Sequence, residues 1–214
     1  MSEIKSGIRY AARSSKLLPT FLIMMVVCTF ALNSNVILPV FAKNVLLGDE
    51  STYSLLMSLM GLGSFSGALF MAGPGKNVRS KYFLAFVALA LGTLQMMTLL
   101  GLQSVPVTAV LLVCCGFLTL CFLNRANTRI QLNTDDGYRG RVMSIYVLIN
   151  TRSTPVGNSL TGLAMDGLGA KYGFFSNGLI TFVFVGIFFY IYRHFLKKAR
   201  VVPENKEEFT GILH

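Results

Sequence analysis

The stretch LLPTFLIMMVVCTFALNSNVILPVFA, residues 17–42, decides the class of this protein. It contains no charged residue, and a helix of this length crosses the roughly 30 Å hydrocarbon core of a bilayer at about 1.5 Å per residue. A cleavable signal peptide has a shorter apolar region, so the stretch does not resemble one. We therefore predict that residues 17–42 form a membrane-spanning helix.

Five more predominantly apolar runs follow along the chain, each close to the length of about 20 residues that a spanning helix needs. They cover residues 51–72, 82–100, 106–123, 142–165 and 172–192. Only 13% of all residues are charged, whereas soluble domains contain about 25%. The sequence predicts an all-α membrane protein with six transmembrane helices, built from a basic lead segment (1–16), a bundle (17–196) and a tail (197–214).

The net charge of +10 is distributed unevenly. Basic residues cluster before the first span, in every second loop and after the last span, whereas the other loops contain only Lys43 and Lys171. The positive-inside rule therefore predicts a plasma-membrane protein with both termini in the cytoplasm. The same distribution argues against nucleic acid as a partner. Lys5, Arg9 and Arg13 recur every four residues, which is typical of either an interfacial helix or an ordinary basic flank.

The sequence contains no recognisable catalytic or metal-binding pattern. The four cysteines fall inside predicted spans without metal-ligand spacing, and no glycine-rich phosphate loop or Ser/His/Asp arrangement is present. We predict a protein that is not an enzyme and that uses no metal and no cofactor.

Arg152 lies near the middle of the fifth run, where a charged side chain costs about 3 kcal/mol. All nine acidic residues lie in predicted loops or tails. The counter-charge of Arg152 is therefore a substrate anion, a backbone carbonyl, water or another chain, and we predict that Arg152 faces a central cavity. Pro155 and Gly157 follow closely, and we predict that they bend the helix.

Three asparagines in the spans are further candidates for the lining of a substrate cavity. Asn33 and Asn35 lie in the first span, and Asn150 lies beside Arg152 in the fifth. An equally plausible alternative is an interhelical hydrogen-bond network, in which each contact contributes about 0.6 kcal/mol.

Residues 127–178, NTRIQLNTDDGYRGRVMSIYVLINTRSTPVGNSLTGLAMDGLGAKYGFFSNG, resemble the segment from the tenth-helix loop to the start of the twelfth helix in major facilitator superfamily transporters. The efflux branch with macrolide and siderophore exporters is the most similar. The matching positions are Gln131, Asp135, Asp136, Arg139, Gly140, Arg141, Val142, Pro155, Gly157 and Gly162. The opening SGIRYAARSSKLLP, residues 6–19, similarly resembles the lead into the seventh helix.

This resemblance implies the C-terminal six-helix half of a transporter, with 3+3 inverted repeats and alternating access. A complementary N-terminal half or a second copy of the chain would complete it, in a lipid bilayer, and a small molecule would be the exported substrate. Asp135, Asp136, Arg139 and Arg141 would form a cytoplasmic gate cluster, although a solvated loop is equally consistent with their sequence.

The sequence also departs from this branch. Arg152 stands where the branch more often has glycine. An alternative interpretation is therefore a non-transporting remnant, or a membrane interaction subunit, derived from a split or truncated transporter.

Overall fold

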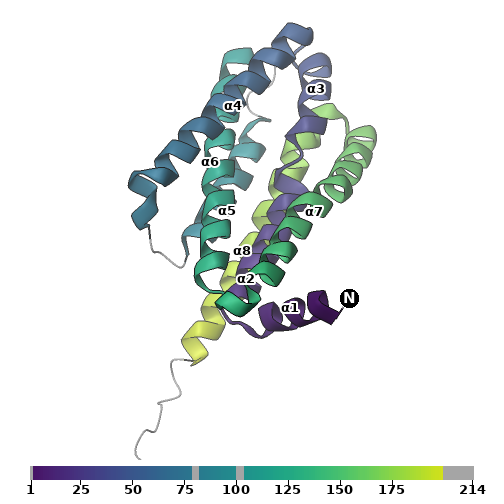
Figure 1. Cartoon of the computed structure of the whole chain (residues 1–214). Coiled ribbons are helices and arrows are strands. Elements are labelled where there is room, and N and C mark those ends of the chain that lie inside the picture. The colour runs from purple at the N-terminus through teal and green to yellow at the C-terminus, as the bar shows by residue number, and fades with distance from the viewer. Residues whose placement is uncertain (1, 79–81, 100–103, 200–214) are drawn as a thin grey trace, which may run out of the picture.

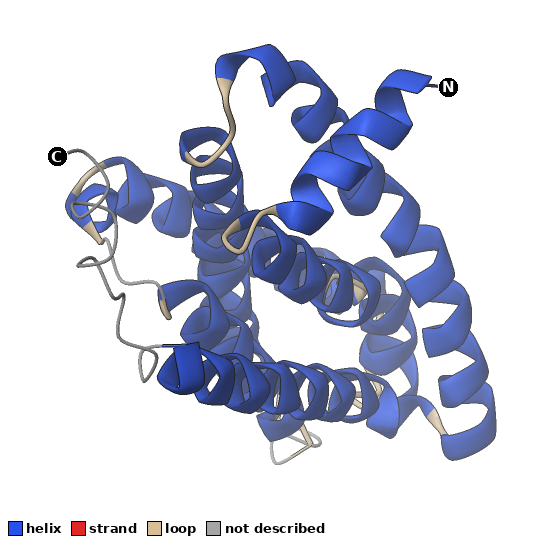
Figure 2. Cartoon of the chain, turned by 90° about the horizontal axis from the view of Figure 1, so that it is seen from below, coloured by secondary structure: helices blue, strands red, loops and turns tan. Residues whose placement is uncertain are grey.

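The computed structural model describes residues 2–78, 82–99 and 104–199, with side chains for 6–75, 78, 82–99 and 104–191. All regular structure in these ranges is helical, joined by short connections (Figure 2). The predicted all-α fold is therefore confirmed for the described part of the chain. Most of the predicted tail, from residue 200 onward, lies outside the described residues.

The main helices follow the predicted runs. They are α1 (Ser2–Arg13), α2 (Leu17–Val26), α3 (Ser34–Asn44), α4 (Glu50–Ala72), α5 (Phe83–Met97), α6 (Val105–Leu132), α7 (Arg139–Leu168) and α8 (Gly173–Ala199). A π-helix, η1 (Val27–Ala31), joins α2 to the break before α3, and short 3-10 turns occupy η2 (Pro74–Asn77), η3 (Asp136–Tyr138) and η4 (Ala170–Tyr172).

Four segments of the described chain are long and apolar enough to cross a membrane: 17–44, 50–72, 105–132 and 170–191. The helix α5 is apolar but has 15 residues. The helix α7 has 30 residues but carries the polar run at 150–154. Both helices correspond to predicted spans, but α5 is shorter than the other four segments and α7 is more polar.

The first span is interrupted, although its sequence predicts one continuous helix. The α-helical hydrogen bonds give way to a π-helix at Val27–Ala31, and a new helix begins at Ser34 after Asn33. The side-chain amide of Asn33 donates to the carbonyls of Thr29 (2.6 Å) and Phe30 (3.4 Å). Because backbone groups inside a bilayer need partners, these side-chain bonds allow the interruption to persist.

Glycines bring α4 and α6 into close contact. Gly63 and Gly67 are four residues apart, a spacing that permits a close helix–helix contact. A Cβ atom at Gly63 would overlap the carbonyl of Val113, and one at Gly67 would meet the carbonyl of Phe117. Gly116 on α6 makes the reciprocal approach to α4. Glycines on both helices therefore allow this close contact.

Buried apolar residues form two clusters along the bundle. The larger joins α1, α2, η1, α5, α6, the beginning of α7 and the middle of α8. The smaller joins α3, α4, α6, the end of α7 and the beginning of α8. Three buried polar residues, Asn33, Thr161 and Asn177, fall in sequence between members of the two clusters. Polar contacts therefore occupy the region between two apolar cores.

The predicted lead segment forms the helix α1, which lies across the lower end of the bundle beneath α7 (Figure 1). Its Tyr10 ring stacks on Tyr138, with ring centroids 4.4 Å apart. Gly7 and Ala11 are buried, whereas Arg9 and Arg13 are exposed. One face of α1 therefore packs against the protein and leaves its cations free to face solvent or lipid headgroups.

Candidate functional site

One face of α7 is exposed along the middle of the helix and carries Arg152. Residues on this face recur at helical spacing and include Leu148, Thr151, Pro155 and Ser159. Within the described residues, the Arg152 side chain has no ion pair and no hydrogen bond. A cation is thus presented from the middle of a long helix to whatever covers this face.

The helix α4 also exposes a large apolar face. Leu55, Leu62, Phe65 and Leu69 are between 52% and 64% exposed. In Figure 1, α4 and α7 flank the bundle on opposite sides, with α6, α8 and α2 between them. The two flanking helices therefore offer two surfaces to lipid or to another helical unit.

Asn33 does not lie on the exposed face with Arg152. It is fully buried, and its amide donates to the Thr161 hydroxyl at 3.1 Å. The amide of Asn177 donates to the same hydroxyl at 2.9 Å. These contacts join the first span, α7 and α8, so Asn33 takes part in the interhelical network that was the alternative to a cavity role.

The other two asparagines lie in different surroundings. Asn35 is exposed at the beginning of α3. Asn150 is half-buried, and its side-chain oxygen accepts a weak hydrogen bond from the Cys28 thiol at 3.8 Å. The structure therefore does not bring Asn33, Asn35 and Asn150 to Arg152 as one cluster.

Pro155 and Gly157 have separate environments on α7. The helix is continuous from Arg139 to Leu168, and Pro155 is exposed within it. Gly157 is buried, and a Cβ atom there would overlap the carbonyl oxygen of Thr29. Gly157 thus allows α7 to approach the π-helix of the first span, a contact that its place near a proline does not predict.

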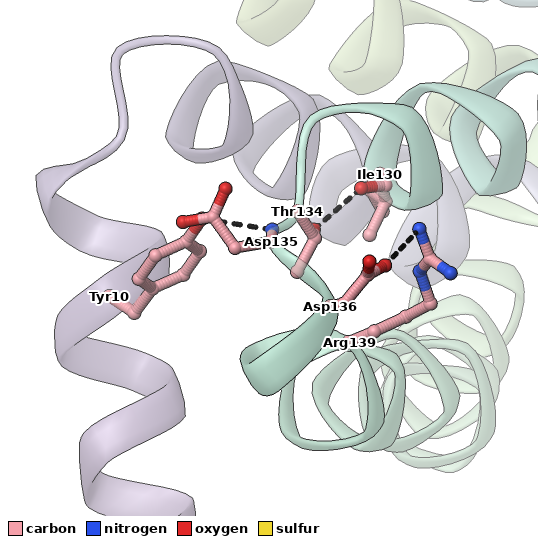
Figure 3. Close-up of polar contacts among 6 residues, drawn as sticks. All are labelled: Tyr10, Ile130, Thr134, Asp135, Asp136 and Arg139. Carbon is pink, nitrogen blue, oxygen red and sulfur yellow. Dashed lines mark hydrogen bonds and ion pairs between the residues drawn. The ribbon is translucent and has the colours of Figure 1, made fainter.

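The four residues of the predicted gate cluster divide into two arrangements, and Figure 3 shows three of these residues, Asp135, Asp136 and Arg139. Arg139 and Asp136 form an ion pair at 2.8 Å, with both side chains largely exposed. The Asp135 backbone N–H donates to the Tyr10 hydroxyl at 3.2 Å. Arg141 turns toward α1, where it donates to the Ser6 hydroxyl at 3.4 Å. One pair faces solvent, and the other two residues hold α1.

Acidic and metal-binding groups are sparse in this architecture. Within the part of the chain that the structure describes, no group of three or more His, Cys, Asp or Glu side chains comes together. The chemistry available on the exposed face of α7 is therefore recognition by one cation and neighbouring hydroxyl groups.

Comparison with protein families gives a match over most of the chain. A model for a family of the major facilitator superfamily, described as transmembrane secretion effector, matches residues 1–208. The chain belongs to this family. Major facilitator proteins are membrane transporters rather than enzymes, so the chain is an integral membrane protein of a family that moves small molecules across a lipid bilayer. Searches of curated proteins and of solved structures found no match.

Sequence reasoning missed several residues that organise this transporter-family fold. Thr161 and Asn177 complete the buried network with Asn33, and Tyr10 with Tyr138 holds α1 to α7. The available signal was an amide or hydroxyl inside an apolar run. That signal does not say which helix the polar group meets, because helix contacts depend on packing.

Proposed function

We propose that this chain is one six-helix half of an efflux-type major facilitator transporter and that it works by alternating access with a complementary half. The family match supports transport. The observation that carries the proposal is the exposed Arg152 side chain, which has no polar partner among the described residues. A lone cation at this depth is costly against lipid and typical of a transport pathway.

Contacts between helices support six spans arranged as 3+3 inverted repeats. Gly63, on the second span, packs against the Val113 carbonyl on the fourth. Gly157, on the fifth span, packs against the Thr29 carbonyl on the first. The second helix of each proposed repeat thus meets the first helix of the other, and the two third helices, α5 and α8, pack together. Such reciprocal contacts are expected when two repeats are related by a common pseudo-two-fold axis.

The exposed faces of α4 and α7 support a complementary half as the partner. Lipid can cover the leucines and Phe65 of α4, but it solvates the polar residues of α7 poorly. A second copy would bring another Arg152 and no acidic residue from its spans. A partner with a carboxylate at this depth is therefore favoured over a homodimer.

The orientation follows the charge distribution. In this proposal the chain lies in the plasma membrane. Both termini and the Asp136–Arg139 pair are in the cytoplasm, and Lys43 and Lys171 are on the outer side. In the assembled transporter Arg152 binds either an acidic group of the substrate or a carboxylate of the complementary half. The exposed Asp136–Arg139 pair forms the cytoplasmic contact between halves, and Asp135 and Arg141 support it by holding α1 in place.

The test is transport by the chain expressed with a complementary six-helix half and reconstituted in liposomes. We expect substrate movement only when both halves are present. Arg152→Gly abolishes or redirects transport, whereas Arg152→Lys, which keeps the charge, retains part of it.

Two outcomes would overturn the proposal. Transport by the purified chain as a monomer contradicts the need for a second half. Equal transport by Arg152→Gly and wild type, with the same substrates, contradicts the site. Absence of transport with every complementary half would favour the remnant interpretation.

A further inference from the structure

Two exposed cations, Arg13 and Lys16, line a groove at the beginning of the first span, and a third, Arg9, lies in a neighbouring hollow. The groove, here called the α1–α6 groove, has a volume of about 470 Å³ and lies between the α1–α2 junction and the end of α6. Arg13, Ser15, Lys16, Leu132, Asn133 and Asp135 line it. A neighbouring hollow of about 400 Å³ shares Arg13 and adds Arg9.

The cations of this groove and of the neighbouring hollow are available to a ligand. The side chains of Arg9, Arg13 and Lys16 are exposed and form no ion pair or hydrogen bond with another described residue. One carboxylate, Asp135, lines the same space and is also exposed. The lining therefore has an excess of positive charge that the rest of the described protein does not neutralise.

Side-chain contacts fix the position of α1 relative to the loop that follows α6. Tyr10 accepts a hydrogen bond from the backbone N–H of Asp135 (Figure 3). Its ring also stacks on Tyr138, and the two contacts hold α1 against the loop after α6. Gly7 packs closely against Arg141 on the same side. These contacts give the groove two walls from segments that are far apart in the sequence.

The depth of the groove matches that of lipid headgroups. Lys16 immediately precedes Leu17, the first residue of a membrane-spanning segment. Headgroups lie just outside the hydrocarbon core, and basic residues near the surface attract anionic lipids. The groove therefore opens at the level where a lipid phosphate is found.

Apolar side chains continue from the groove along α2. Leu18, Leu22 and Met25 are 39–49% exposed and occupy one face of this helix. Leu132, which lines the groove itself, is 78% exposed. A free phosphate would leave this apolar surface uncovered, whereas the acyl chain of a lipid can cover it.

We propose that the α1–α6 groove binds the phosphate headgroup of an anionic phospholipid, with an acyl chain along Leu18, Leu22 and Met25. Arg13 and Lys16 contact the phosphate, and Arg9 adds positive charge nearby. This inference rests on the proposed topology only in assigning the lipid to the cytoplasmic leaflet, and it does not require transport.

The first experiment measures lipid retention by native mass spectrometry on the purified full chain, with phosphatidylglycerol and phosphatidylcholine as probes. We expect preferential retention of phosphatidylglycerol. Arg13→Gln and Lys16→Gln each weaken it about fivefold, which corresponds to about 1 kcal/mol per cation. The matched control is Arg139→Gln, which removes the same charge at the same end of the bundle but outside the groove, and it leaves retention unchanged.

A second variant acts in the opposite direction. Asp135→Asn removes the carboxylate from the groove and tightens phosphatidylglycerol retention. Melting temperatures measured in detergent without added lipid verify that the variants are folded. Equal retention of both lipids by wild type, or an equal loss in Arg139→Gln and Arg13→Gln, would overturn the site in favour of general surface attraction.

A third arm separates a lipid from a free anion. Short-chain phosphatidylglycerol raises the melting temperature of the wild-type chain, whereas inorganic phosphate at the same concentration does not. Equal stabilisation by inorganic phosphate would overturn the lipid assignment. Because no arm measures transport, failure here leaves the proposed transport function intact, and failure of transport leaves this site intact.

Discussion

The side-chain amide of Gln95 donates a hydrogen bond of 2.8 Å to the backbone carbonyl of Ala31. Ala31 is the last residue of the π-helix in the first span, and Gln95 lies near the end of α5. Both residues are buried. A side chain 64 positions away in sequence thus provides a partner for a carbonyl where the regular helix is interrupted.

Replacement of Gln95 by leucine tests this contact. Gln95→Leu leaves the Ala31 carbonyl buried without its side-chain donor, and we expect a loss of about 1–3 kcal/mol in the free energy of unfolding. Denaturant unfolding in detergent measures the change. Thr93→Val is the control, because Thr93 is exposed on the same helix and, among the described residues, its hydroxyl bonds only to the Ala90 carbonyl. Equal stability of the two variants would contradict a stabilising role.

A second prediction concerns the contact between α7 and the first span. Gly157→Ala places a Cβ atom against the Thr29 carbonyl, and overpacking of this kind costs about 1–3 kcal/mol. Gly162→Ala is the matched control, since among the described residues nothing lies within 4 Å of a Cβ atom there. Thermal unfolding of both variants should show a lower melting temperature for Gly157→Ala alone.

The Asp136–Arg139 pair distinguishes a gate from a solvated loop. Both side chains are more than half exposed, so Arg139→Gln changes stability by less than about 1 kcal/mol. If the pair joins the halves, the same variant slows transport in the assembled protein. The double variant Asp136→Arg, Arg139→Asp, which exchanges the two charges, then restores part of the transport rate. Normal transport by Arg139→Gln would favour the solvated loop.

Topology can be measured by cysteine labelling in a background without native cysteines. We expect Lys171→Cys to react with an impermeant reagent from outside intact cells, and Leu132→Cys to react only after permeabilisation. Leu132 is 78% exposed, so burial does not prevent its labelling. Labelling of position 132 from outside would reverse the proposed orientation.

Asp49 gives a prediction for the dependence of stability on pH. Hydrogen bonds from the Ser51 hydroxyl and from the Thr52 backbone N–H and hydroxyl lower the pKa of Asp49 from 3.8 to about 2. Because the folded pKa is below the unfolded value, the carboxylate contributes stability above about pH 4, and this contribution is lost as the pH falls through about 2.

The comparison of wild type with Asp49→Asn measures this contribution. The difference in melting temperature between the two proteins should be larger at neutral pH than near pH 2. Asparagine keeps a neutral side-chain acceptor at the start of α4, so the comparison isolates the charge. A difference that does not vary with pH would contradict the predicted linkage.

The membrane class and the positions of the main helices are readable from the sequence, and the spacing of Gly63 and Gly67 permits the close contact that the structure shows. Apolar run length follows from the thickness of the bilayer, and a GxxxG spacing places two small residues on one helical face. These are properties of single segments. The lead helix α1 was one of two interpretations of a basic repeat, and the structure contains it as a helix.

Only the tertiary structure decided the roles of the polar residues inside the spans. Asn33 and Arg152 both interrupt apolar runs, yet Asn33 is buried in a hydrogen-bond network and Arg152 is exposed. The interruption at Val27–Ala31 likewise depends in part on Gln95, a residue of another helix. The sequence by itself determined that these polar groups need partners. Which partner each one reaches depends on the faces that packed helices present to one another, and that information is not contained in a single run of residues.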